Sequence, residues 1–113
     1  MVKTSTDIEY VAQIFKLLGD KTRLMMMKIL EEDACCVCEL VEIFQMSQPA
    51  ISQHLRKLKD MDLVEEERKG QWIFYSINRE QEYFPIVQQI LLQLPSQKDK
   101  LDALAAQGKR IVL

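Results

Sequence analysis

The chain of 113 residues has no apolar run near the roughly 18 residues that a membrane-spanning helix needs. Charged residues interrupt every hydrophobic stretch that comes close, namely Lys16, Lys28, Glu39 and Glu42. The first residues, 1–7, also lack the apolar segment of a signal peptide. These absences argue against a membrane protein, and we expect a cytoplasmic one.

Cysteine is absent everywhere except in one short stretch, where Cys35, Cys36 and Cys38 fall within four positions. An odd number of cysteines packed so closely is not a disulfide framework, and the cytoplasm keeps thiols reduced. The sequence has no Cys-x-x-Cys motif in a βαβ context and no other catalytic constellation. A thiol oxidoreductase is therefore disfavoured, and we expect that the protein is not an enzyme.

No internal repeat, linker or low-complexity segment divides the chain, so we assign residues 1–113 to one domain. A domain of this length has a small core, and a homodimer interface would bury more surface. The net charge of −2 neither predicts nor excludes DNA binding, because binding depends on where the charges lie.

Apolar residues at helical spacing predict a mainly α-helical fold. Asp20 is a good N-cap for the second helix and Ser47 for the fourth, where Pro49 is tolerated in the first turn. The third and fourth helices, joined by a tight turn, form a helix-turn-helix. The predicted helices cover residues 8–18, 24–30, 35–44, 48–59, 85–94 and 97–107, the last opened by a capping box of Ser96 and Asp99.

Residues 63–64 and 72–77 are rich in β-branched and aromatic side chains, which predicts two strands. Lys69 and Gly70 form a turn signal between them. A hairpin that directly follows a helix-turn-helix makes a winged helix. The predicted fold class is therefore mainly α with a small β-hairpin, a winged helix-turn-helix.

The fourth helix has an apolar side of Ile51, Leu55 and Leu58, and residues 47–59 contain three Lys or Arg and no acid. Gln pairs well with adenine and Arg with guanine, whereas Ser and Lys suit phosphates. The wing tip is also basic and suits a minor-groove or phosphate contact. The predicted contacts to double-stranded operator DNA are Ser47, Gln48, Ser52, Gln53, His54, Arg56 and Lys57 on the helix and Arg68, Lys69 and Gln71 on the wing.

Two alternatives remain open for these elements. The first is that the fourth helix is a solvated surface helix that makes no contact with DNA. The second is that the winged helix binds a protein instead of DNA. For His54, a packed or phosphate-contacting side chain is favoured over a metal ligand, because it lies nearer the apolar side of the helix.

The predicted helix near residues 85–94 is too apolar to face water. We expect it to pair with the first helix in a homodimer, and the alternative is packing within its own protomer.

The three thiols suit a soft trivalent ion such as As(III) or Sb(III) better than Cd(II) or Pb(II), which usually take three or four sulfurs. A helix N-terminus lowers a thiol's pKa and favours the thiolate, which binds metals but also oxidises. A repressor that senses oxidants or reactive sulfur is therefore the main alternative. Residues i and i+2 of a regular helix point to nearly opposite sides, so we expect an ion that binds two thiols at this spacing to unwind the helix start.

Residues 17–24 (LLGDKTRL), 36–40 (CVCEL) and 46–55 (MSQPAISQHL), followed by 70–72 (GQW), resemble the ArsR/SmtB family of dimeric winged-helix repressors. The resemblance covers residues 8–94. It implies a homodimer on a pseudo-palindromic operator and repression that a ligand lifts. No resident cofactor is implied.

Cys36 and Cys38 match the cysteine motif at which arsenic-, cadmium- and lead-responsive members of that family bind their ion. Val41 stands where some arsenic repressors carry a third thiol, so Cys35 is the only thiol left to complete the set. The family's Asp and His site after the wing is not matched, because no histidine follows His54. The predicted metal ligands are Cys35, Cys36 and Cys38.

Overall fold

The computed structural model describes residues 7–111. The prediction that residues 1–113 form one domain extends beyond this range and stays a prediction. The predicted lack of a signal peptide concerns residues 1–7, of which residues 1–6 lie outside the described range. The elements are α1 (Ile8–Leu18), α2 (Lys21–Glu32), β1 (Cys35–Cys36), α3 (Val37–Phe44), α4 (Gln48–Asp60), β2 (Val64–Lys69), β3 (Trp72–Ile77), α5 (Phe84–Leu92) and α6 (Lys98–Ala106).

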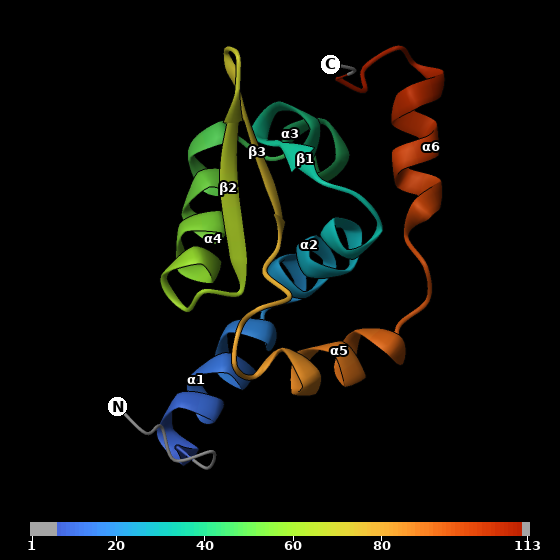
Figure 1. The fold of residues 1–113 in the computed structure, drawn as a ribbon. Helices are drawn as coiled ribbons and strands as arrows, with labels where there is room; N and C mark the ends of the chain where they lie inside the picture. The colour runs from blue at the N-terminus through green and yellow to red at the C-terminus, as the bar shows by residue number, and fades with distance from the viewer. Residues whose placement is uncertain (1–6, 112–113) are drawn as a thin grey trace.

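These elements form a winged helix-turn-helix, which confirms the predicted fold class. Figure 1 shows α3, α4 and the β2–β3 hairpin together at one end of the molecule, with α1 and α5 at the other. Helix α6 packs against α2 and α3. Within residues 7–111, no helix is both long and apolar enough to cross a bilayer.

Side-chain caps fix where α2 and α4 begin. The Asp20 carboxylate accepts a hydrogen bond from the Arg23 N–H at 3.0 Å, and the Ser47 hydroxyl accepts one from the Ala50 N–H at 3.3 Å. Both predicted caps are confirmed. The predicted capping box at Ser96 is wrong: α6 starts one residue later, at an N-cap of Gln97, and the Ser96 hydroxyl donates to Glu32 at 2.9 Å.

The sheet has three strands in the order β1-β3-β2, all antiparallel. The predicted wing is confirmed, with Lys69 opposite Trp72 at the tip and Gly70 at a positive φ of 64°. The prediction that the third helix begins at Cys35 is wrong. Cys35 and Cys36 are extended and pair with Tyr75 and Phe74 of β3, because the free edge of that strand offers backbone hydrogen bonds.

The core is built around α2, whose Met26, Met27 and Ile29 are fully buried. Methionine fills irregular space well, which explains its use in this central helix. Ile51, Leu55 and Leu58 of α4 are also fully buried, so the predicted apolar side of that helix is confirmed. This packing fixes the rotation of α4 and decides which of its side chains face solvent.

Candidate functional site

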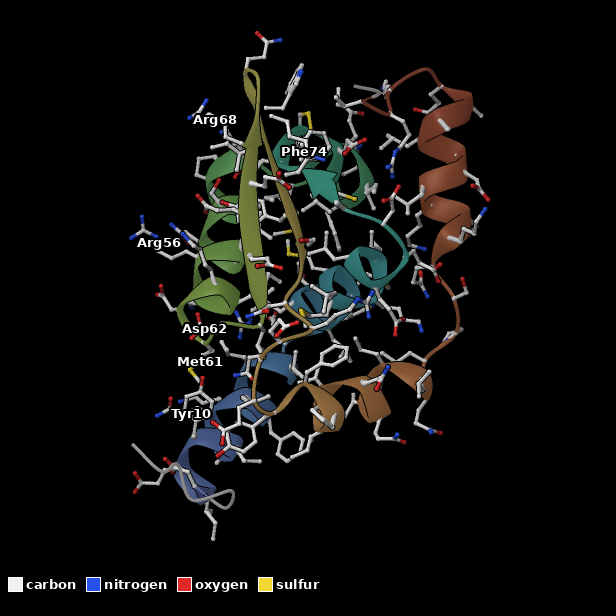
Figure 2. All side chains as sticks on the ribbon, in the orientation of Figure 1. Tyr10, Arg56, Met61, Asp62, Arg68 and Phe74 are labelled. Carbon is white, nitrogen blue, oxygen red and sulfur yellow. A yellow bond between two sulfur atoms is a disulfide. The ribbon has the colours of Figure 1, made fainter. Side chains whose placement is uncertain are left out.

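Helix α4 presents its polar residues on the side away from the core. Gln48, Gln53, Arg56 and Lys57 are exposed, and Ser52 is half-buried. Figure 2 shows Arg56 extending from α4 and Arg68 from the hairpin on the same side of the molecule. The helix and the wing therefore offer two sets of donors to one partner surface.

His54 differs from the other predicted DNA contacts because it is turned toward α2. Its Nδ1 lies 3.2 Å from Arg23 Nη1 and 3.8 Å from Asp20 Oδ2. Arg23 also donates from Nε to the Leu17 carbonyl at 2.8 Å. The pKa of Asp20 lies below its ordinary value, chiefly because the Arg23 N–H bonds to the carboxylate, with the charges of Arg23 and His54 acting in the same direction. His54 thus joins α4 to the start of α2.

The wing combines a basic tip with acidic residues on β2. Arg68, Lys69 and Gln71 are exposed at the tip. Glu66 accepts a hydrogen bond from the Tyr75 hydroxyl at 3.2 Å, and its carboxylate lies 3.2 Å from Lys59 Nζ on α4. Of the three consecutive acids of β2, Glu65, Glu66 and Glu67, Glu66 is therefore paired, and the pairing links the wing to α4.

Cys36 and Cys38 lie side by side at the start of α3, where their sulfurs form a disulfide with the Cα atoms 5.4 Å apart. The premise that both cysteines lie in a regular helix is wrong, whereas the unwinding of the helix start by a bound ion stays a prediction. Cys36 is the N-cap residue, with an extended backbone (φ −85°, ψ 166°), and only Cys38 is within the helix. The change of backbone direction between them brings the side chains together.

Cys35 does not join this pair. It is fully buried in the core, on the opposite face of β1 from Cys36, as alternation along a strand requires. Burial, and next the charge of Glu39, raises the pKa of the Cys35 thiol to about 12, so the thiol is neutral at neutral pH. Within residues 7–111, no three His, Cys, Asp or Glu side chains converge as a metal site. Two of the three predicted ligands are together, and the ligand role of all three stays a prediction.

A cavity of about 430 Å³ opens beside the cysteine pair, between α3, the start of α4 and the wing. It was not predicted, because only the pairing of β1 with β3 brings the wing tip to the thiols. Gln48 and Gln71, both predicted DNA contacts, lie on its wall. The lining residues are Cys36, Val37, Cys38, Val41, Glu42, Gln48, Gln71, Trp72 and Ile73.

A buried carboxylate holds the backbone of the cysteine pair. Glu39 is fully buried, and its Oε1 accepts a hydrogen bond from the Cys36 N–H at 2.9 Å. Its Oε2 accepts one from the Ile111 N–H at 2.9 Å and lies 3.1 Å from Arg110 Nε. Sequence reasoning missed Glu39, although its place three residues after the N-cap is the capping-box position. Residues 109–111, the C-terminal segment, thus contact the thiol end of α3.

Comparison with known proteins identifies the family. A model of the "Bacterial regulatory protein, arsR family" matches residues 20–66, from the cap of α2 into β2. An uncharacterised HTH-type transcriptional regulator of Methanocaldococcus jannaschii is 44% identical over 70 residues, covering 61% of this chain and 79% of that protein. The chain belongs to the arsR family. It is a DNA-binding transcriptional regulator and not an enzyme.

Other arsR-family relatives and winged-helix structures agree. The arsenical resistance operon repressor of Bacillus subtilis is 41% identical over 70 residues, covering 61% of this chain and 67% of that protein. Reduced HlyU from Vibrio cholerae has a TM-score of 0.64 and 26% identity, covering 75% of this chain and 90% of that one. The homodimeric winged helix-turn-helix DNA-binding domain of Mb0332 from Mycobacterium bovis has a TM-score of 0.63 and 27% identity, covering 80% of this chain and 89% of that one.

Proposed function

We propose that the protein is a dimeric repressor that binds operator DNA through α4 and the wing and is released when As(III) binds Cys36 and Cys38. The observation that carries the proposal is the adjacency of Cys36 and Cys38, whose sulfurs are joined in the structure and become two neighbouring thiols on reduction, at the start of α3, the helix that supports α4. The likeness to an arsenical resistance operon repressor supports arsenic as the inducer. Sb(III) has the same soft, three-bonded chemistry. Binding to chromosomal DNA implies a cytoplasmic location.

The proposed DNA contacts follow from exposure. Gln53 and Arg56 reach base edges, while Lys57, Arg68 and Lys69 contact phosphates. Ser47 and Ser52 have polar groups near the start of α4, and Gln48 and Gln71 lie where helix and wing approach each other. His54 supports α4 through its contact with α2 instead of binding DNA.

Dimerisation through α1 and α5 is supported by the apolar side chains that these helices expose. Phe15 on α1 is 50% exposed and Leu92 on α5 is 58% exposed. The rings of Tyr10 on α1 and Tyr83 at the N-cap of α5 lie 5.3 Å apart, so the two helices meet where α5 begins. A two-fold dimer places its two recognition helices about one DNA turn apart, on two half-sites.

The proposed inducer chemistry is exchange without oxidation. As(OH)₃ reacts with two thiols, two As–S bonds form, and two water molecules leave while arsenic stays trivalent. A third bond to Cys35 would require β1 to leave β3 and Cys35 to leave the core. Cd(II) and Pb(II), which usually take three or four sulfurs, fit a pair less well. A coupling of about 1–3 kcal/mol between the pair and α4 changes operator affinity by about 5–150-fold.

The test uses the reduced protein and a fluorescent fragment of its own promoter region. As(III) should release the fragment from the wild type but not from Cys36→Ser or Cys38→Ser. The matched Cys35→Ala variant should still respond, since Cys35 is apart from the pair. Retained release in both serine variants would refute the thiol-pair proposal.

A second candidate is a redox sensor, favoured by the disulfide between Cys36 and Cys38. Peroxide would take two electrons from the two thiols, giving the disulfide and two water molecules. If peroxide releases the DNA fragment and stoichiometric As(III) does not, the redox function replaces the arsenic one.

A further inference from the structure

We infer that the cysteine pair selects trivalent arsenicals that carry one organic group, R–As(OH)₂, and that the organic group occupies the cavity beside the pair. This inference rests on the proposed function, because it names the class of inducer that the same two thiols bind. The juxtaposition that supports it is two adjacent sulfurs, a third sulfur held elsewhere, and an apolar cavity next to the pair.

The number of available sulfurs, two, matches the number of exchangeable hydroxyls in such a compound. R–As(OH)₂ has two exchangeable hydroxyls, and Cys36 and Cys38 replace both, giving two As–S bonds and two water molecules. The As–C bond is kept and arsenic stays trivalent, so no oxidant or reductant is needed beyond the reduced state of the pair. Inorganic As(OH)₃ would retain one hydroxyl at the same pair, because Cys35 is fully buried on the opposite face of β1.

The cavity offers the organic group an apolar environment. Val37 and Val41 come from α3, and Trp72 and Ile73 come from the start of β3. The volume of about 430 Å³ falls in the range of about 300–1,000 Å³ typical of small-molecule sites. Aromatic rings favour offset or edge-to-face contact with one another, so the indole of Trp72 suits an aryl substituent.

The polar rim of the same cavity connects the organic group to DNA binding. Gln48 lies in the first turn of α4, and Gln71 lies at the wing tip. A ligand that extends from the thiols toward these residues would contact both α4 and the wing, the two DNA-binding elements. An organoarsenical should therefore release DNA at a lower concentration than arsenite does.

The test compares phenylarsine oxide, which hydrates to C₆H₅As(OH)₂, with arsenite on the full reduced chain by calorimetry. A phosphine keeps the pair reduced, because dithiol reductants would capture the arsenicals. Trp72, the one tryptophan of the sequence, also reports binding by its fluorescence. We expect the phenyl compound to bind about 10-fold or more tightly than arsenite, as burial of an aromatic group predicts.

Substitutions in the cavity lining test whether the lining causes the preference for the phenyl compound over arsenite. Trp72→Ala and Val41→Asn should each reduce the phenyl preference at least 3-fold while arsenite affinity stays within 2-fold. Val and Asn have similar helix propensities, so the second variant should leave α3 intact. The matched control, Ile43→Val, shortens a side chain of the same helix that does not line the cavity and should keep the full preference.

Each result has a distinct meaning. Equal affinity of the wild type for both compounds, or a preference unchanged in both cavity variants, overturns the organic-group inference and leaves arsenite sensing intact. Failure of both compounds to bind overturns the proposed function itself. In Cys35→Ala, phenylarsine oxide should bind within 2-fold of the wild type. A large loss there would show a three-sulfur site and overturn the inference.

Discussion

Replacing Arg110 with alanine should destabilise the protein far more than its position near the end of the described chain suggests. The Arg110 side chain is 17% exposed and its Nε lies 3.1 Å from Oε2 of Glu39, which is fully buried. Removing one partner of a buried ion pair typically costs about 3–5 kcal/mol, because the remaining charge is left without its counterion. The Cys36 and Ile111 N–H groups still donate to the carboxylate, so we expect the lower end, about 3 kcal/mol.

Such a loss is measurable without abolishing the fold, since domains usually have about 5–15 kcal/mol of stability. Urea unfolding of the reduced protein, followed by Trp72 fluorescence at fixed protein concentration, gives the free energy of unfolding directly. In a thermal scan the same change corresponds to a fall in Tm of roughly 10–15 °C for a domain of this size.

The neighbouring residue supplies a matched control. Lys109 Nζ lies 3.0 Å from Glu42 Oε1, but both side chains are exposed. Exposed ion pairs contribute about 0–1 kcal/mol, so Lys109→Ala should change stability by no more than that. The double variant Arg110→Ala/Glu39→Gln should recover part of the loss, because it removes the unpaired charge. An Arg110→Ala variant as stable as Lys109→Ala would refute the reasoning.

Three further predictions concern DNA binding, dimerisation and thiol chemistry. Arg56→Ala should weaken operator binding by about 1–3 kcal/mol in fluorescence anisotropy, with unchanged stability; equal affinity at every salt concentration would remove Arg56 from the contacts. Phe15→Glu should shift sedimentation toward monomer, whereas Lys16→Glu on the same helix should not. The folded pKa of Cys35 is raised from 9.0 to about 12, so the unfolded thiol ionises at a lower pH than the folded one. The contribution of this thiol to the free energy of unfolding should therefore be fully present below pH 9 and be lost as the pH rises toward 12. Cys35→Ala should remove most of that fall in urea titrations, and an unchanged pH profile would contradict the assignment.

Local patterns determined most of the DNA-binding half from the sequence. The caps at Asp20 and Ser47, the apolar side of α4 and the wing turn at Gly70 all depend on residues a few positions apart. Periodicity and capping chemistry detect such relationships, and the structure confirms them. The family resemblance rests on the same local stretches, and the comparisons confirm it.

The sequence determined one part of the thiol site, and the tertiary structure determined the rest. The sequence by itself determined that the only cysteines stand next to the helix that supports α4. It could not determine which sulfurs meet, since that depends on β1 pairing with β3, a strand almost forty residues later in the chain. That pairing turns Cys36 toward Cys38, turns Cys35 into the core, and brings Trp72 to the cavity.

The role of the C-terminal segment was likewise decided only by tertiary structure. Glu39 and Arg110 are 71 positions apart, and charged residues at such positions are ordinarily solvated. Their burial follows from the way α6 packs on α2 and α3 and returns residues 109–111 to the start of α3. The sequence therefore determined the elements and their chemistry, whereas contacts between distant segments decided how the thiols, the cavity and the buried ion pair are assembled.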